Sequence, residues 1–417
     1  MKDEIMKEAI LFFYTSSMGD KLHPFLLEET KILSSNFDLL HIICLDAKCG
    51  YKQLEPFHNV TIHPIKRRRR YTSVLSLMQL LVRKEVRLEI NRARHDHILS
   101  VNYIKELLRV ALPGFLMFSI AKDVVNGKMG NEICVESYWF DASAYAAARL
   151  KEMLPESKMV TRAHGIEIDP VRNVFTSYEL KNYCYSMLDS ISFISDYGKG
   201  VFLKTTGKKY GIGDTSKLNV FRLGVEKKNV GRAKQSCDGA LRIVTCSRIE
   251  SVKRIPLLIE GLKNITDIPV IWTHFGDGSE FEKVKESAKH LPSNIKVFLK
   301  GNCSNETVHQ YYSSNSVDVF INVSFSEGIP VSIMEAFAYG IPCIATDVGG
   351  TSELVNKSNG ILIHKDISPG DLASNILDYY VLSSEKKREM GDAAIRTWST
   401  KYNSITNQKM FIDFLKG

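Results

Sequence analysis

Two cationic side chains, Arg248 and Lys253, follow the apolar run 241–246 at a spacing of five residues. The run has the continuous hydrophobicity of a buried parallel strand, so Arg248 lies at its end and Lys253 near the start of the next helix. A guanidinium offers phosphate a two-donor fork, an ammonium adds a compact charge, and a helix start favours an anion. The pair therefore predicts a diphosphate site, although each charge alone is also typical of a solvated surface.

Two glutamates eight residues apart follow a second apolar run, 317–323. Glu327 stands on the loop beside Gly328, and Glu335 lies on the helix whose first turn Pro330 fits. Carboxylates that flank a glycine loop and a helix start suit a sugar nucleotide, because the helix start binds phosphates and the acids accept hydrogen bonds from hydroxyls. Taken singly, a capping glutamate and a helix-surface glutamate are equally ordinary interpretations.

Strand-like apolar runs alternate with helical patterns along the whole chain. This alternation predicts right-handed crossovers and doubly wound parallel sheets, in which ligands bind outside the carboxyl ends of the strands. The expected strands are 10–14, 39–45, 60–65, 133–135, 158–161, 191–194 and 218–221, then 241–246, 270–275, 295–299, 317–323, 342–346 and 360–363.

A stretch without apolar periodicity, 225–240, separates two such units. We therefore expect a Rossmann-like N-terminal domain over 1–224, a linker over 225–240 and a Rossmann-like C-terminal domain over 241–395. A last helical segment, 396–417, is expected to pack back on the N-terminal domain.

The composition is that of an ordinary globular chain of about two domains, with 417 residues, 44% of them hydrophobic and 24% charged. The eight cysteines include no CxxC pair and are typical of free thiols in a reducing compartment. No apolar run near the first residue is long enough for a signal peptide, and none approaches the roughly 18 residues of a membrane span. We therefore expect a cytoplasmic protein.

Taken together, these segments resemble the retaining nucleotide-sugar glycosyltransferases of family 4. The resemblance rests on Arg-x4-Lys after the first strand of the second unit and on Glu-x7-Glu after its fourth. It extends to Phe275-Gly276-Asp277-Gly278, to Asp347-Val348-Gly349-Gly350 and, in the first half, to Thr161-Arg162-Ala163-His164-Gly165. Tyr138-Trp139 is similar to the members that build bacterial surface polysaccharides such as O-antigen and capsule. The implied fold is α/β of the GT-B type, two Rossmann-like domains whose parallel sheets face a central cleft.

The resemblance implies two groups of site residues. At the reacting centre, Glu327 accepts hydrogen bonds from the donor sugar, and His164 lies across the cleft from it. Along the donor, Arg248 and Lys253 hold the diphosphate and Glu335 binds the ribose. The remaining donor contacts come from the backbone N–H groups of Gly328, Ile329 and Val331.

The resemblance also implies a retaining, metal-independent hexosyltransferase without a cofactor. Retention in this family is explained by front-face attack, in which the leaving phosphate accepts the proton of the acceptor, so no side-chain nucleophile is needed. The sequence contains no Asp-x-Asp triplet to support a metal-held diphosphate. The expected donor is a UDP-sugar whose base lies near 300–303, and the expected acceptor is a glycan or a lipid-linked oligosaccharide.

Basic residues are concentrated between Lys66 and Arg109, where twelve Lys and Arg oppose four acids. Five of them, residues 66–70, are consecutive, and the apolar stretch 112–118 lies further along the chain. A basic and apolar helical region is typical of binding to anionic lipid, whereas nucleic acid is not a favoured partner. We expect a protein peripheral to the inner face of the cytoplasmic membrane, with an acceptor or membrane face at Arg67, Arg68, Arg69 and Arg70. The ordinary alternative is a solvated loop.

Two other classes of function share this architecture. A nucleotide-sugar epimerase or isomerase makes the same phosphate and ribose contacts but needs acid and base carboxylates that face the sugar, and the Glu-x7-Glu context argues against it. A catalytically inactive binding module is the other alternative. The four intact side chains of Arg248, Lys253, Glu327 and Glu335 argue against that class.

Overall fold

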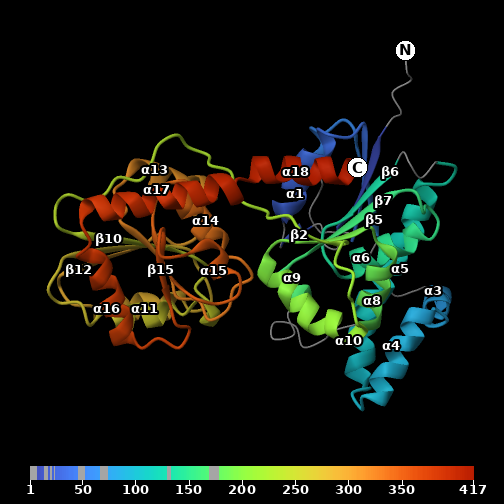
Figure 1. The fold of residues 1–417 in the computed structure, drawn as a ribbon, viewed down its shortest axis with the longest axis horizontal. Coiled ribbons are helices and arrows are strands. Elements are labelled where there is room, and N and C mark those ends of the chain that lie inside the picture. Colours follow the sequence, from blue (N-terminus) through green and yellow to red (C-terminus); the bar gives the residue numbers. More distant parts are fainter. Residues whose placement is uncertain are drawn as a thin grey trace. The chain divides into compact units, whose positions relative to one another are not determined.

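The computed structural model describes residues 7–13, 17–18, 21–22, 24–45, 52–65, 74–128, 133–168 and 178–417. The chain divides into two compact units, each with its own parallel sheet (Figure 1). The first unit is formed by Met1–Phe221 together with Gln408–Gly417, and the second by Arg222–Asn407.

In the described part of the chain, the first unit has a seven-stranded parallel sheet in the order β5-β4-β1-β6-β7-β8-β9. The strands are β1 Glu8–Phe13, β4 Leu39–Leu45, β5 Val60–Ile65, β6 Ile133–Ser137, β7 Lys158–Ala163, β8 Ser190–Phe193 and β9 Leu218–Val220. A short antiparallel pair, β2 Ser17–Met18 and β3 Lys21–Leu22, lies outside this sheet.

Two apolar cores cover the two faces of this sheet. Ile10 and Phe12 of β1 enter one core, and Leu11 and Phe13 enter the other, because successive side chains of a strand point to opposite faces. The described helices of the unit are α1 Pro24–Ser34, α3 Val74–Leu81, α4 Lys84–His95, α5 Val101–Val124, α6 Ala142–Lys151, α7 Gly165–Ile168, α8 Tyr178–Met187, α9 Asp196–Phe202, α10 Lys208–Tyr210 and α18 Ser404–Lys416.

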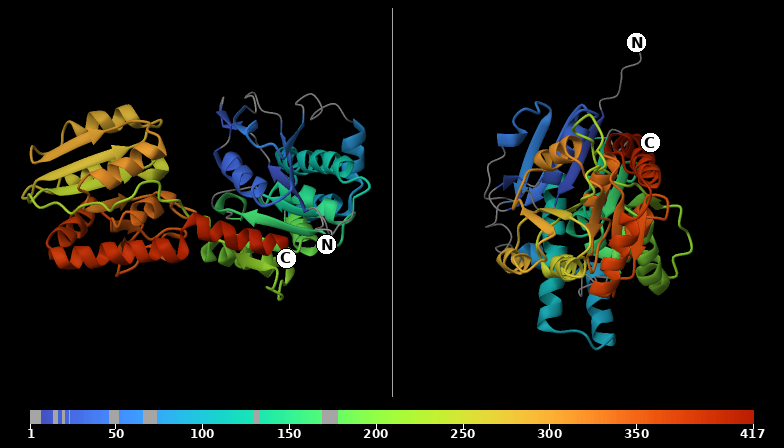
Figure 2. Two further views of the ribbon diagram at one scale, coloured as in Figure 1. Left: turned by 90° about the horizontal axis from the view of Figure 1, so that it is seen from above. Right: turned by 90° about the vertical axis from the view of Figure 1, so that its left-hand side faces the viewer.

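The second unit has a six-stranded parallel sheet in the order β12-β11-β10-β13-β14-β15, with helices on both faces (Figure 2). Its strands are β10 Leu241–Cys246, β11 Val270–Phe275, β12 Ile295–Leu299, β13 Val319–Asn322, β14 Cys343–Thr346 and β15 Gly360–Ile363. Its helices are α11 Ile255–Leu262, α12 Phe281–Ala288, α13 Asn305–Ser314, α14 Val331–Ala338, α15 Thr351–Leu354, α16 Pro369–Tyr380 and α17 Ser384–Lys401.

The predicted fold class is confirmed, since a strand forms at every predicted run and both sheets are parallel. Residues 225–240, for which the sequence predicts a linker, belong to the second unit. The Ala233 N–H donates to the carbonyl of Tyr339, and Lys234 forms a β-bridge with Ser316. At the other end of the chain, the residues from Gln408 onward belong to the first unit.

Two further expectations concern membranes and thiols. Of the helices that the structure describes, none is both long and apolar enough to cross a membrane. The cysteines within the described residues are free, and those at positions 44, 134, 184 and 343 are buried.

Candidate active site

The strand order of the second unit turns back between β10 and β13, which are hydrogen-bonded neighbours. Ligand sites in open parallel sheets lie outside the carboxyl ends of the strands at such a point. The segments that follow these two strands also touch each other, since the Phe325 N–H donates to the carbonyl of Val252 at 2.8 Å. The fold therefore brings together the two segments predicted to bind a donor.

Lys253 and Glu327 form an ion pair at this edge of the sheet. The Nζ atom of Lys253, at the end of a 3₁₀ turn over Ser251–Lys253, lies 2.6 Å from Oε1 of Glu327. The side-chain amide of Asn322 donates to the same oxygen at 3.4 Å. The carboxylate is thus held in one orientation, while an ammonium has three protons and so keeps donors for an anion.

Arg248 is exposed just beyond β10. Within the described residues its guanidinium is in no ion pair, and it does not contact Glu327. Beside it, the buried side chain of Ile249 anchors the loop to the core of the unit. Arg248 is therefore available to a ligand with all its donors, and Lys253 with the protons that it does not give to Glu327.

The loop between β13 and α14 presents unused backbone donors. The N–H groups of Gly328, Ile329 and Val331 have no carbonyl acceptor among the residues that the structure describes. On the other side of the loop, the Gly350 N–H donates to the Gly328 carbonyl at 2.7 Å. Gly349 has φ 57°, and a Cβ there would lie 1.9 Å from the carbonyl oxygen of Glu327. The carbonyls of the loop thus face the glycine pair, and its N–H groups remain for a ligand.

Glu335 is held on the second turn of α14 by two side chains of α13. Asn305 donates its amide to Oε1 of Glu335 at 3.3 Å, and Nε2 of His309 lies 3.7 Å from the same oxygen. Nδ1 of His309 is 3.0 Å from the hydroxyl of Tyr339. The sequence analysis missed Asn305 and His309, whose only signal is a spacing of four residues on one face of a helix.

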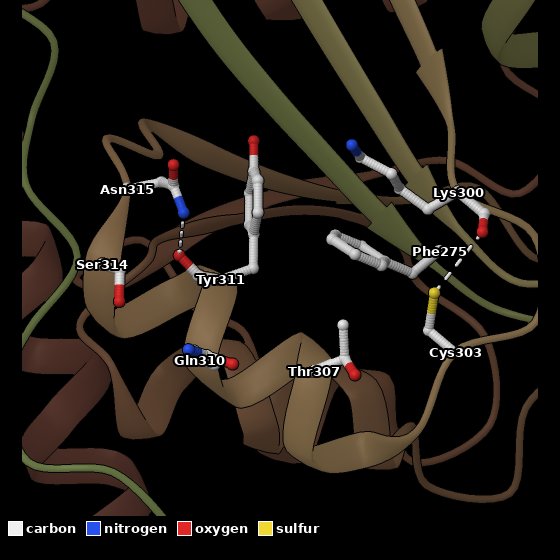
Figure 3. A pocket seen from close by; sticks show the side chains of 8 residues that line it. All are labelled: Phe275, Lys300, Cys303, Thr307, Gln310, Tyr311, Ser314 and Asn315. Carbon is white, nitrogen blue, oxygen red and sulfur yellow. Dashed lines mark hydrogen bonds between the residues drawn. The ribbon is translucent and has the colours of Figure 1, made fainter.

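A cavity of about 320 Å³ lies beside α13 (Figure 3). The ring of Phe275, at the end of β11, meets the ring of Tyr311 edge-on at 5.1 Å between centroids. Lys300 and Cys303, from the loop where we expect the base, also line the cavity. The full lining is Phe275, Lys300, Cys303, Thr307, Gln310, Tyr311, Ser314 and Asn315. The cavity has the size and the aromatic walls that a small planar ligand needs.

Glycine brings the β11 loop close to the segment that carries Arg248. Gly276 has φ 137°, and a Cβ there would lie 1.8 Å from the carbonyl oxygen of Ser247. The N–H of Gly276 also donates to the carbonyl of Gly301 at 2.8 Å. The three loops after β10, β11 and β12 are thus in mutual contact at one edge of the sheet.

In the first unit, His164 follows β7 at the carboxyl edge of the sheet. Its ring stacks on Tyr138, with centroids 5.1 Å apart and planes at 29°. Its Nδ1 lies 3.4 Å from Oε1 of Glu167, and the His164 side chain is 14% exposed. Within the described residues neither ring nitrogen has a hydrogen bond. Buried polar groups are normally paired, so this ring is a candidate for contact with a ligand. Glu167 is a third residue that sequence reasoning did not single out.

A buried charged triad, Glu29, Glu136 and Arg162, lies under the same edge. Nη2 of Arg162 donates to Glu29 at 2.8 Å, and its Nε lies 2.8 Å from Oε1 of Glu136. Burial raises the pKa of Glu136 well above its usual range and raises the pKa of Glu29 as well. One guanidinium thus faces two carboxyl groups, and burial disfavours the charged form of both carboxyls.

The predicted residues therefore fall into three sets. Lys253 and Glu327 are in contact, and the other donor-binding positions lie in the same unit. His164 belongs to the first unit. Arg67, Arg68, Arg69 and Arg70, the predicted acceptor or membrane face, lie outside the described residues.

Residues 228–397 match the family model described as Glycosyl transferases group 1. The chain is 31% identical over 168 residues to the putative teichuronic acid biosynthesis glycosyltransferase TuaC of Bacillus subtilis. This alignment covers 40% of this chain and 39% of TuaC. It is also 31% identical over 143 residues to the lipopolysaccharide 1,6-galactosyltransferase of Escherichia coli, over 32% of this chain and 37% of that protein. The chain thus spans less than two fifths of the length of these curated relatives.

The fold has counterparts among solved structures. The Anabaena protein HepE in complex with UDP aligns over 98% of this chain and 99% of its own, with a TM-score of 0.69 at 15% identity. This likeness extends over both units and has the GT-B architecture. The protein is therefore a two-domain protein with the GT-B fold. Within its second unit, residues 228–397 are similar to the group 1 glycosyltransferases, in line with the resemblance to family 4.

Proposed function

We propose that this protein is a glycosyltransferase that moves a sugar from a nucleotide-sugar donor to a glycan acceptor. The observation that carries the proposal is the Lys253–Glu327 pair beside the unused N–H groups of the Gly328 loop, inside a group 1 glycosyltransferase domain. Cationic and N–H donors suit a diphosphate, and a fixed carboxylate suits sugar hydroxyls.

The donor in this proposal is a UDP-sugar. The diphosphate lies between Arg248 and Lys253, and Glu335 accepts hydrogen bonds from the ribose. Phe275 and Tyr311 supply aromatic surface for the base in the neighbouring cavity. The complex of HepE with UDP, on the same fold, supports this choice.

The reaction in this proposal retains the anomeric configuration and needs no metal. As the bond between the sugar and the β-phosphate breaks, negative charge grows on the diphosphate. Lys253, Arg248 and the N–H groups of the loop stabilise that charge. The acceptor hydroxyl attacks the anomeric carbon on the face from which the phosphate leaves, and the leaving phosphate takes its proton. The new glycosidic bond therefore forms without inversion at the anomeric carbon.

The acceptor in this proposal is a lipid-linked oligosaccharide of a bacterial surface polysaccharide. The names of the relatives, which refer to teichuronic acid and lipopolysaccharide, support this class of product. A lipid-linked acceptor places the enzyme at the inner face of the cytoplasmic membrane, where the basic segment around Lys66–Arg109 meets anionic lipid.

A thermal-shift panel of UDP, GDP, ADP, CDP and their hexose conjugates tests the proposal. A ligand at a hundredfold excess over its Kd stabilises the folded state by about 2.7 kcal/mol, so the correct nucleotide stands out. Release of free nucleoside diphosphate with the selected donor then separates a transferase from an epimerase, which keeps the diphosphate attached. If none of the nucleotides stabilised the protein, the proposal would be contradicted.

A further inference from the structure

The helices α3 and α4 meet at a corner at the periphery of the first unit (Figure 1). Three large apolar side chains are exposed there: Met78 is 60% exposed, Leu81 41% and Val82 66%. Leu88, one helical turn into α4, is 42% exposed. Clustered exposed apolar residues of this kind mark surfaces that become covered.

The charges of α4 are sorted by face. Its basic residues Lys84, Arg87 and Arg94 are exposed and, among the described residues, are in no ion pair. Their spacing of three and seven residues puts them on one side of the helix, together with Leu88. This side of α4 therefore carries positive charge and apolar surface together.

The acids of α4 point the other way. Glu85 is buried and accepts a hydrogen bond from the hydroxyl of Tyr145 at 2.6 Å. Glu89 is buried as well and is paired with Arg92, while the Tyr103 hydroxyl donates to it at 2.5 Å. Both acids are thus used inside the unit, and no acid on α4 opposes the three outward bases. The net positive charge of this face is a property of the fold, not only of the composition.

We propose that this α3–α4 surface docks on an anionic lipid membrane. Met78, Leu81 and Val82 enter the boundary between headgroups and acyl chains, and the three bases contact lipid phosphates. An anionic membrane complements this surface, because its apolar acyl chains match the three exposed apolar residues and its negative headgroups match the unpaired bases of α4. The inference rests on the proposed function for the reason the enzyme meets a membrane, which is its lipid-linked acceptor.

The basic half of the surface is tested by sedimentation of the full chain with vesicles. Each base near an anionic surface raises partitioning by about fivefold at low salt, so K84S/R87S/R94S should bind vesicles of phosphatidylglycerol and phosphatidylcholine about a hundredfold more weakly than the wild type. The control K283S/K285S/K289S removes the same charge from exposed positions on α12 and at the residue just after it, and should stay within about twofold of the wild type. The difference should shrink at high salt because of screening.

The apolar half is tested by M78S/L81S/V82S. This variant should lose vesicle binding even at low salt, while V230S/V381S, at exposed positions of the second unit, should keep it. Equal thermal unfolding midpoints for all variants confirm that only the surface has changed.

The inference would be overturned if the wild type did not bind anionic vesicles at low salt, or bound neutral vesicles equally well. It would also be overturned if K84S/R87S/R94S bound vesicles like the wild type, or if the control variant lost as much binding as K84S/R87S/R94S. Loss of binding to an oligonucleotide, with no vesicle binding at all, would assign the surface to another polyanion. Stabilisation by UDP is measured in parallel. A protein that binds UDP but not vesicles contradicts this inference and leaves the proposed function intact. A protein that binds vesicles but no nucleotide contradicts the proposed function and not the docking surface.

Discussion

Lys253 commits one ammonium proton to Glu327 and keeps the others, while Arg248 is exposed and has its whole fork available. A charge-assisted hydrogen bond to a diphosphate contributes roughly 1.5–3 kcal/mol. We therefore expect Arg248→Ala and Lys253→Ala each to weaken UDP binding by roughly tenfold to a hundredfold, measured by calorimetry. Lys263→Ala, at the residue just after α11, is the matched control. UDP binding near that of the wild type in both variants would show that the two cations serve the fold alone.

The two glutamates should separate in function, because their surroundings differ. Glu327 faces Lys253, while Glu335 is held by Asn305 and His309. Glu327→Gln should keep UDP affinity within about threefold and lose most transfer, because only the sugar depends on it. Glu335→Ala should weaken UDP itself. Calorimetry with free UDP and initial transfer rates measure the two effects, and equal losses in both variants would contradict the division of roles.

Asp141 caps α6 by accepting a hydrogen bond from the Ser143 N–H at 2.9 Å, and burial raises its pKa to about 7. Since the unfolded value is about 4, the folded state binds this proton more tightly. This contribution to stability is fully present below about pH 4 and is lost as the pH rises through 7.

Asn keeps the capping oxygen without the charge. Asp141→Asn should therefore match the wild type at about pH 4 and exceed its free energy of unfolding at about pH 8 by roughly 2–4 kcal/mol, allowing for partial exposure. Urea denaturation at both pH values checks this, with Asp267→Asn at a surface position as control. A constant difference across the pH range would contradict the assignment.

At the scale of helices and strands, local pattern carries most of the information. The run 241–246 forms β10 over the same residues, because a strand covered on both faces must be apolar throughout. Residues 225–240 show no apolar periodicity that would indicate their place in the second unit. They are held there by backbone hydrogen bonds, such as that from the Ala233 N–H to the Tyr339 carbonyl, which do not depend on side-chain type. Partners distant in sequence, such as His309 and Glu335, are set by how α13 packs beside α14, which periodicity does not encode.

The triad of Glu29, Glu136 and Arg162 joins α1, β6 and β7, and the ring of Phe411 from α18 lies 3.9 Å from the Arg162 guanidinium carbon. Removing one member of a buried charged group leaves the others unpaired and costs about 3–5 kcal/mol. Arg162→Met should therefore lower the free energy of unfolding of the first unit by about that amount.

The triple variant E29Q/E136Q/R162M removes all the charges and should recover most of that loss. Urea denaturation followed by the near-ultraviolet signal measures both variants, and UDP binding by the second unit serves as an internal control. A triple variant no more stable than Arg162→Met would show that the charges themselves do not decide the stability.

For the whole molecule, the chain returns to its first unit at the end. Phe411, Ile412 and Leu415 of α18 are buried in the apolar core that β1 and β4 share. The position of the predicted last helix therefore follows from its apolar face, whereas the point where the chain re-enters the first unit, at Gln408, needed the structure.

The proposed reaction depends on all the groups that bind the leaving diphosphate. In the proposed mechanism Arg248, Lys253 and the N–H groups of Gly328, Ile329 and Val331 supply the positive charge for the leaving diphosphate, and no divalent cation takes part. Transfer with the selected UDP-sugar should therefore continue in excess EDTA at a rate within about twofold of the untreated enzyme, since the chelator removes nothing that the transition state uses.

In the proposed mechanism attack and departure take place on the same face of the sugar, so the product linkage should keep the anomeric configuration of the donor. The anomeric proton coupling in the NMR spectrum of the freshly formed product reports this directly. Two results would contradict the mechanism: activity abolished by EDTA and restored by Mn²⁺, or a product of inverted configuration. The first result would mean that a metal neutralises the charge on the diphosphate. The second would mean that a general base acts on the opposite face of the sugar.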